Sequence, residues 1–148
     1  MMFKLPSLFA VVFLFSSFSV MANSPLKMDV FIETGAEKNV FAPTGRKVSE
    51  FNVYRVDTLK IVEENMSKGL SADPSEAKEQ VLAMMNSDKF RNQYSIDMME
   101  GWSTINKVVR LGIEKVPAVV INDKYVVYGV SPKEAVTIYD QYIIRYGN

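Results

Sequence analysis

The chain has 148 residues, of which 48% are hydrophobic, and its 17 basic and 17 acidic residues give a net charge of zero. One domain with a hydrophobic core is the default at this length, and the balanced charge disfavours nucleic-acid binding, which usually needs a basic excess. The sequence contains no cysteine and no histidine. It therefore excludes disulfides, thiolate metal sites and thiol nucleophiles, and it lacks the commonest general base and metal ligand.

Residues 1–22 have the features of a secretory signal peptide. Lys4 gives a positive start, residues 8–20 are apolar apart from small serines, and Ala22 ends a short segment that suits signal peptidase. An uncleaved anchor helix is the alternative, but the apolar run is short for spanning a membrane. We therefore predict cleavage after Ala22, one exported domain over residues 23–148, and no stable membrane insertion after cleavage.

The first part of the mature chain predicts two strands joined by a loop. Residues 28–34 form a short β-branched and aromatic run, and residues 51–56 alternate between the two faces expected of a strand. Pro43 and Gly45 lie in the connecting segment, where they break any long helix. Asp57 follows the second strand at a position suited to capping a helix.

Two helices are predicted next. Residues 58–70 carry apolar side chains at helical spacing, and Gly69 ends that pattern. The following helix has a clear start signal, with Asp73 as N-cap, Pro74 at the first helical position and Glu76 placed to close a capping box.

The longest predicted helix runs from about Lys89 to Leu111, where Gly112 is a natural stop. Its apolar side chains step by three or four residues and predict one buried stripe: Phe90, Tyr94, Met98, Trp102, Ile105 and Val109. We favour core packing for Trp102 over a role as an exposed partner anchor. Gly101 weakens the helix by about 1 kcal/mol relative to alanine, and it marks either a break or a close contact.

The last part of the chain predicts a hairpin and a final helix. Pro117 precedes two short apolar runs that are separated by Asn122-Asp123, a spacing that suits a hairpin turn. The last helix begins with Ser131 as its cap and with Glu134 closing a capping box. The expected order of elements is β-β-α-α-α-β-β-α, which predicts a single α/β domain.

The segment KVPAVVINDKYVVYG and the helix after it resemble the C-terminal half of the thioredoxin fold. The resemblance implies a three-layer fold with a mixed central sheet, a reduced or missing first helix, a proline-led β-hairpin and a final helix. It places Val116-Pro117 at the cis-proline position, where redox relatives pair backbone groups with extended substrates. The relatives' catalytic cysteines follow the first strand, but residues 35–40 here contain no thiol, and thiol–disulfide exchange needs a thiolate.

A narrower resemblance covers nearly the whole mature chain. The stretches DVFIETG, VYRVD, GLSADPSEA and WSTINKVVRLGIEKVPAVVINDKYVVYG resemble a family of short exported proteins encoded by integrating conjugative elements of Gram-negative bacteria. This resemblance implies a periplasmic location and a role in the conjugative transfer apparatus. It implies no defined biochemical activity.

We therefore expect a non-enzymatic binding or assembly module that contacts other proteins of the conjugative transfer apparatus, without nucleic acid, metal or cofactor. The candidate partner-binding residues should lie together at one end of the sheet: Gly35, Glu37, Lys38, Arg46, Lys47, Val116 and Pro117. A periplasmic holdase chaperone that uses the same edge is the alternative. A hydrolase with paired carboxylates is a third hypothesis, but the acidic residues fall on faces that we expect to be solvated. The sequence leaves the oligomeric state open.

Overall fold

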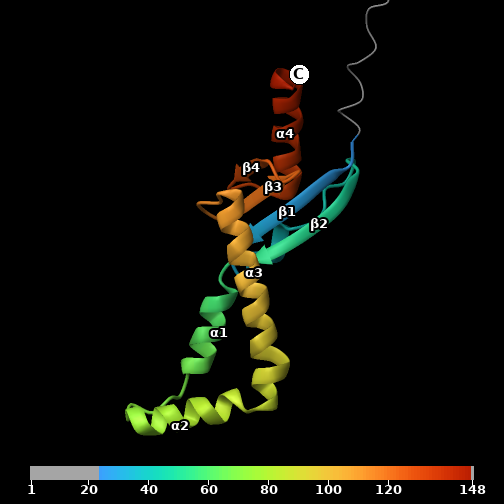
Figure 1. Cartoon of the computed structure of the whole chain (residues 1–148). Coiled ribbons are helices and arrows are strands. Elements are labelled where there is room, and N and C mark those ends of the chain that lie inside the picture. Colours follow the sequence, from blue (N-terminus) through green and yellow to red (C-terminus); the bar gives the residue numbers. More distant parts are fainter. Residues whose placement is uncertain (1–23, 148) are drawn as a thin grey trace, which may run out of the picture.

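The computed structural model describes residues 24–147, so the predicted signal peptide lies outside the described residues (Figure 1). Within this range the elements follow the predicted order, with a 3₁₀ turn η2 (Glu37–Asn39) and a π-helical turn η3 (Phe90–Tyr94) added. The strands are β1 (Leu26–Ile32), β2 (Val48–Arg55), β3 (Ala118–Ile121) and β4 (Tyr125–Tyr128). The helices are α1 (Thr58–Ser67), α2 (Pro74–Met85), α3 (Ser95–Leu111) and α4 (Pro132–Tyr146).

The four strands form one open, mixed sheet in the order β2-β1-β3-β4. β1 and β2 are parallel and pair from Leu26–Val48 at one end to Ile32–Arg55 at the other. β3 is antiparallel to β1 and begins beside Phe31, and β4 completes the hairpin. The predicted mixed sheet and proline-led hairpin are confirmed.

The central strand β1 is buried on both faces, so the core has two halves. Met28, Val30 and Ile32 belong to a cluster that includes residues of α4. Phe31 belongs to a second cluster on the opposite face, together with Ile113 just after α3. Side chains alternate across a strand, so this division places α4 and the end of α3 on opposite faces of the sheet.

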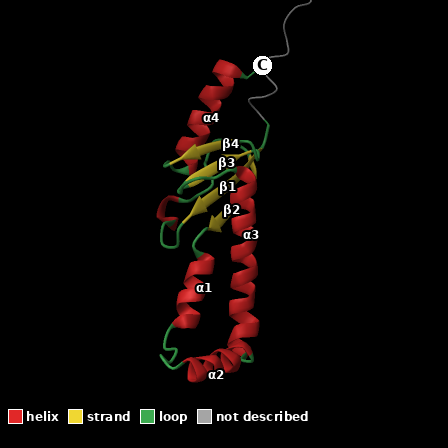
Figure 2. Cartoon of the chain, turned by 60° about the vertical axis from the view of Figure 1, so that its left-hand side comes forward, coloured by secondary structure: helices red, strands yellow, loops and turns green. Residues whose placement is uncertain are grey.

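A helical arm, defined here as residues 58–103, extends away from the sheet (Figures 1 and 2). It contains α1, α2, η3 and the first half of α3, and in α1 only Val62 is buried. Gly101 lies against α1, where an added Cβ would stand 2.7 Å from the Leu59 Cγ atom. Of the two alternatives for Gly101, a break or a close contact, the structure shows the close contact.

The buried side of α3 differs from the predicted stripe. Tyr94 of the predicted stripe is buried, but it lies in η3. In α3 itself Gly101 and Thr104 are buried, whereas Trp102 of the stripe is 57% exposed and Val109 is 74% exposed. The preference for core packing of Trp102 was therefore wrong. The buried residues, Gly101 and Thr104, and the exposed residues, Trp102 and Val109, both recur at helical spacing. The buried set is covered because α1 packs against the side of α3 that carries Gly101.

The helix starts confirm part of the predicted capping. Asp73 accepts hydrogen bonds from the amides of Ser75 and Glu76 at the start of α2, but the Glu76 carboxylate accepts from the Ser71 hydroxyl instead of closing a box. Asp57 makes no side-chain cap bond to α1, in contrast to the prediction. Its carboxylate instead accepts hydrogen bonds from the backbone amide and hydroxyl of Thr34.

Both predicted turn positions of the second half are confirmed. Gly112 ends α3 in the left-handed conformation with φ of 64°. Asn122 and Asp123 between β3 and β4 have φ of 54° and 53°. Asparagine and aspartate tolerate this region better than most residues, which is why they suit the turn of a hairpin.

At the start of α4 the capping box is complete, and we expect Ser131→Ala to lower the free energy of unfolding by about 1 kcal/mol at neutral pH. The Glu134 amide donates to the Ser131 hydroxyl over 3.3 Å, and the Ser131 amide donates to the Glu134 carboxylate over 2.9 Å. The Ser131 hydroxyl also donates to Glu134, and this bond, with the backbone bond, holds the pKa of Glu134 below its ordinary value of 4.5. Urea unfolding of both proteins measures the difference.

A carboxyl with a lowered pKa stabilises the folded state above its ordinary pKa and loses that contribution as the pH falls. The difference between wild type and Ser131→Ala should therefore shrink when unfolding is measured at a pH below 4.5. Ser103→Ala, at an exposed position of α3, is the matched control and should change stability little. Equal stability of wild type and Ser131→Ala at neutral pH would contradict the prediction.

Candidate functional site

The end of the sheet beside Pro117 forms a cleft between three segments of the chain. β1 and β2 end here, β3 begins here, and residues of the connection after β1 contribute to the lining of the cleft. The cleft has a volume of about 320 Å³, and Ala36, Asn39, Val40, Pro117 and Val130 are among the residues that line it. We call this cleft, with residues 35–40 and 116–117, the proline end.

The Val116–Pro117 peptide bond at this end is cis, as the thioredoxin resemblance implied. The Pro117 carbonyl accepts a hydrogen bond from the Gly129 amide over 2.9 Å. No hydrogen bond to the backbone N–H or C=O of Val116 is formed within the described residues. Val116 is half-buried and Pro117 is exposed, and Pro117 lines the cleft, whereas Val116 does not.

The segment that crosses the proline end is tied to the end of β2. Glu37 accepts a hydrogen bond from the Arg55 guanidinium over 2.9 Å, and this bond is the main reason why the pKa of Glu37 lies below its ordinary value. Thr34 is held by Asp57 through its amide and hydroxyl. Gly35 adopts φ of 90°, a conformation that side chains rarely allow. Lys38 is exposed in the same turn.

Arg46 and Lys47 lie at the opposite end of the sheet, which corrects the prediction that all seven candidate residues meet at one end. The Lys47 carbonyl accepts from the amide of Leu26, the first residue of β1, over 2.9 Å. Arg46 forms an ion pair with Asp140 of α4 over 3.6 Å. The two ends of β1 are about 20 Å apart. β1 and β2 run in the same direction, so the connection between them must travel back over the length of the strands. Its first residues therefore lie at the end of the sheet where β1 stops, and its last residues lie at the other end, where β2 starts.

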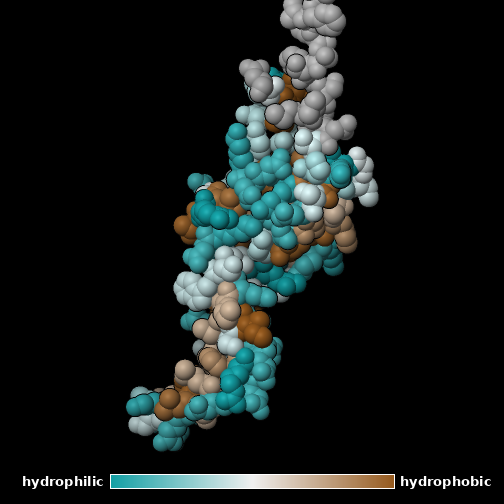
Figure 3. Space-filling view, turned by 45° about the vertical axis from the view of Figure 1, so that its right-hand side comes forward, coloured by the Kyte–Doolittle hydropathy of each residue, from teal (hydrophilic) through white to brown (hydrophobic). Residues whose placement is uncertain are grey.

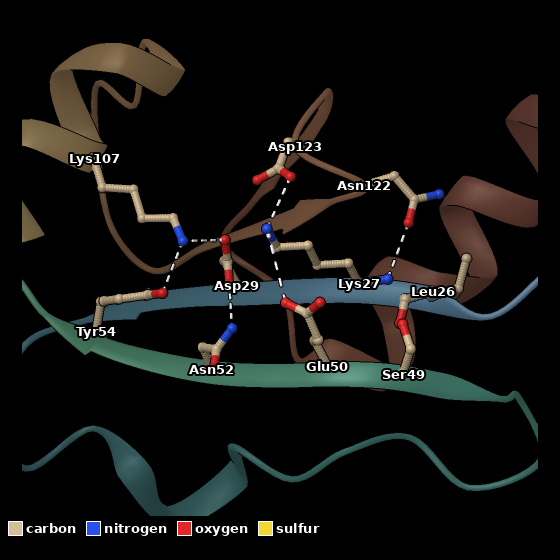
Figure 4. Close-up of polar contacts among 10 residues, drawn as sticks. All are labelled: Leu26, Lys27, Asp29, Ser49, Glu50, Asn52, Tyr54, Lys107, Asn122 and Asp123. Carbon is tan, nitrogen blue, oxygen red and sulfur yellow. Dashed lines mark hydrogen bonds and ion pairs between the residues drawn. The ribbon is translucent and has the colours of Figure 1, made fainter.

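A polar cluster that was not predicted from the sequence lies on the face of the sheet that α3 covers (Figure 4). Asp29 stands in the middle of β1 and is 1% exposed, and its carboxylate lies 2.7 Å from the Lys107 ammonium of α3. The Asn52 amide donates to the same carboxylate over 2.9 Å. Lys107 also donates to the Tyr54 hydroxyl over 2.7 Å. The sequence carried one signal of this cluster, which was the acidic residue Asp29 inside the apolar run MDVFI.

The charges of this cluster are matched in pairs. Burial lowers the pKa of Lys107, but hydrogen bonds to Asp29 and Tyr54 outweigh that effect, so the pKa is raised and the ammonium stays charged. Lys27 lies 3.0 Å from Asp123, and this contact is the main cause of the raised pKa of Lys27 and of the lowered pKa of Asp123. Because the contact with Asp29 keeps Lys107 protonated, this lysine is better suited to hold α3 against the sheet than to transfer a proton.

The acidic residues considered for hydrolysis do not converge on a site. These residues are Asp57, Glu63, Glu64, Asp97 and Glu100. The three glutamates are exposed, as expected, whereas Asp57 and Asp97 are half-buried. Among residues 24–147, no three His, Cys, Asp or Glu side chains come together in a way that could hold a metal ion. None of the helices in that range combines the length and apolar character needed to cross a bilayer.

Comparison with known proteins gave one match. No curated protein and no solved structure matches the chain. Residues 28–145 match a family model that is described as a protein of unknown function, DUF1525. The matched range begins in β1 and ends in α4, so it includes the sheet, the helical arm and the proline end. Because the match covers more than half of the chain, this protein belongs to the DUF1525 family.

Proposed function

We propose that this protein is a non-enzymatic, thioredoxin-like binding module that holds an extended segment of a partner protein at the proline end. The strand order β2-β1-β3-β4, with one parallel pair and a C-terminal hairpin, supports the thioredoxin-like assignment. The absence of cysteine and histidine from the sequence supports a module that binds without thiol chemistry.

The observation that carries this proposal is the unpaired backbone of Val116. Its N–H and C=O groups have no hydrogen-bond partner within the described residues, and the next residue, Pro117, lines the cleft. Buried backbone polar groups are normally paired within the protein, whereas groups near the surface are open to water or to a binding partner. An extended segment offers a donor and an acceptor at each residue, so it can pair with both groups while its side chains enter the cleft.

The cellular setting is part of the proposal. The predicted signal peptide supports export to the periplasm. The resemblance to short exported proteins of integrating conjugative elements supports partners within the conjugative transfer apparatus. In this setting the protein acts as a binding or assembly component of DNA transfer rather than as an enzyme.

A holdase chaperone is the second candidate, because the arm exposes apolar side chains such as Leu82 at 50% and Met99 at 72%. A holdase suppresses the aggregation of many unrelated unfolded proteins, whereas an assembly module retains one defined partner. Light scattering of a chemically denatured model protein, with and without this chain, separates the two.

Partner binding at the proline end is tested with a variant that narrows the cleft. Asn39→Phe places a large side chain at an exposed position that lines the cleft. We expect recovery of the partner from the periplasm of conjugating donor cells to fall about tenfold, which corresponds to about 1.4 kcal/mol of binding free energy. Quantitative mass spectrometry of the co-purified proteins measures the change.

The matched control is Lys47→Phe, which adds the same side chain to an exposed residue at the opposite end of the sheet. This variant should retain the partner. Unchanged recovery by Asn39→Phe, or an equal loss in both variants, would remove the proline end as the binding surface.

A further inference from the structure

An open groove runs along α3 on the side that the core does not use. Its volume is about 950 Å³, and Phe90, Met98, Met99, Trp102, Lys107 and Arg110 are among its lining residues. The groove begins at the π-helical turn before α3 and ends near Tyr54 of β2. It is separate from the proline end, because none of its lining residues borders that cleft.

The part of the groove on the helical arm is apolar and solvent-exposed. Apolar side chains reach the surface along the arm (Figure 3). Met99 is 72% exposed and Trp102 is 57% exposed. Contiguous exposed apolar side chains mark interaction sites, and Met suits surfaces that adapt to a partner.

The part of the groove near the sheet is positively charged. The charged residues that line it are Lys107 and Arg110, whereas Asp97 and Glu100 of the same helix do not line it. Lys107 is matched by Asp29 at 2.7 Å. Arg110 forms no ion pair within residues 24–147, and its attraction to Asp123 is the smallest cause of the lowered pKa of that residue. Arg110 is therefore the cation of the groove that a partner can pair with.

The shape of the groove favours a helix over a small molecule or an extended peptide. A small-molecule site encloses most of its ligand, but Met99 and Trp102 are more than half exposed. An extended peptide would bring unpaired N–H and C=O groups onto a largely apolar surface, which is unfavourable. A helix satisfies its own backbone, and the groove from Met99 to Arg110 is about 16 Å long, or roughly three helical turns.

We propose that this groove binds an amphipathic α-helix of a partner protein. Apolar residues of that helix cover Met99 and Trp102, and acidic residues about two turns further along pair with Arg110. Trp and Arg are the residue types that most often dominate binding interfaces, and here they lie eight residues apart on the same side of α3. The proposal is independent of the proposed function of the proline end.

The test uses the full mature protein and two synthetic peptides without tryptophan, each about five helical turns long. Both carry leucines on one face; one has glutamates and the other lysines beyond the apolar residues. Trp102 is the chain's one tryptophan, so its fluorescence reports the groove directly. We expect a saturable blue shift with the acidic peptide and an affinity about tenfold lower with the basic one.

Arg110→Glu should reverse this preference, and Arg145→Glu, which makes the same charge change on α4, should retain it. Trp102→Ala, followed by anisotropy of a labelled acidic peptide, should weaken binding even if Arg110→Glu folds poorly. Asn39→Phe at the proline end should leave peptide binding to the groove unchanged. The proposal for the groove and the proposal for the proline end can therefore be contradicted independently.

Three results would overturn the proposal. Equal affinity for the acidic and basic peptides would remove the role of Arg110. A blue shift that appears on raising the concentration of the protein alone would assign the groove to a second copy of this chain. A shift with vesicles of anionic phospholipid, but with neither peptide, would assign it to a membrane surface.

Discussion

Lys107→Ala is expected to lower the free energy of unfolding by about 3–5 kcal/mol, because it leaves the Asp29 carboxylate buried without its cation. Asp29 is 1% exposed and its carboxylate lies 2.7 Å from the Lys107 ammonium. Asn52 supplies one further hydrogen bond, which cannot replace the lost charge. A domain of this size has a total stability of about 5–15 kcal/mol, so urea unfolding should show a large shift of the midpoint.

A double variant separates the missing partner from the missing side chain. Asp29→Asn with Lys107→Met removes both charges, keeps an acceptor for Asn52 and retains the apolar length of the lysine stem. Replacing a buried ion pair by neutral groups often costs little, so this variant should be more stable than Lys107→Ala. Lys60→Ala, at an exposed position of α1, should change stability by less than about 0.5 kcal/mol. A loss below about 1 kcal/mol for Lys107→Ala would show that Asp29 does not need this partner.

The Asp29–Lys107 contact also joins the sheet to the helix that continues into the helical arm. Lys107 lies in the part of α3 that meets the sheet, and the same helix continues into the arm. Lys107 donates to Tyr54 of β2 as well, and its ammonium stands 4.4 Å from the centre of the Tyr54 ring. One side chain therefore fastens α3 to two neighbouring strands, at the end of the groove that lies nearest the sheet.

The sequence predicted the strands, their order along the chain and most of the helix ends, because these depend on local patterns. The apolar runs at β1 and β3 are buried on both faces, and such strands stand out in any sequence. Gly112 and Ser131 mark helix ends through backbone conformation and capping, which neighbouring residues decide. The proline end was proposed because Val116-Pro117 and the strand after it resemble the cis-proline segment of the thioredoxin fold.

The errors concern contacts between distant parts of the chain. Helical spacing identified an apolar stripe through Trp102, but it could not show that α1 would cover the Gly101 side instead. Arg46 was placed with Glu37 because both lie in one loop, although the parallel pairing of β1 and β2 separates the two ends of that loop. Asp29 and Lys107 are 78 positions apart in the sequence, and no local pattern joins them.

Gly101→Val is expected to destabilise the protein by about 1–3 kcal/mol through overpacking between α1 and α3. A Cβ at position 101 would stand 2.7 Å from both Cγ and Cδ2 of Leu59, and 3.3 Å from the Leu59 backbone nitrogen. Moving the leucine side chain alone does not relieve the contact with the backbone nitrogen, so α1 must shift. Urea unfolding measures the loss, and the emission of the adjacent Trp102 reports the movement of the arm.

Two comparisons isolate the contact from the intrinsic effect of glycine. Gly101→Ala improves helix propensity by about 1 kcal/mol, so it should cost less than Gly101→Val. In a Leu59→Ala background the valine meets a smaller side chain, and the coupling between the two positions should lie between about 0.5 and 3 kcal/mol. If Gly101→Val costs the same in that background as it does in the wild-type chain, the leucine side chain does not limit how closely the two helices approach. The close approach at Gly101 would then be a consequence of the arm's position and not its cause.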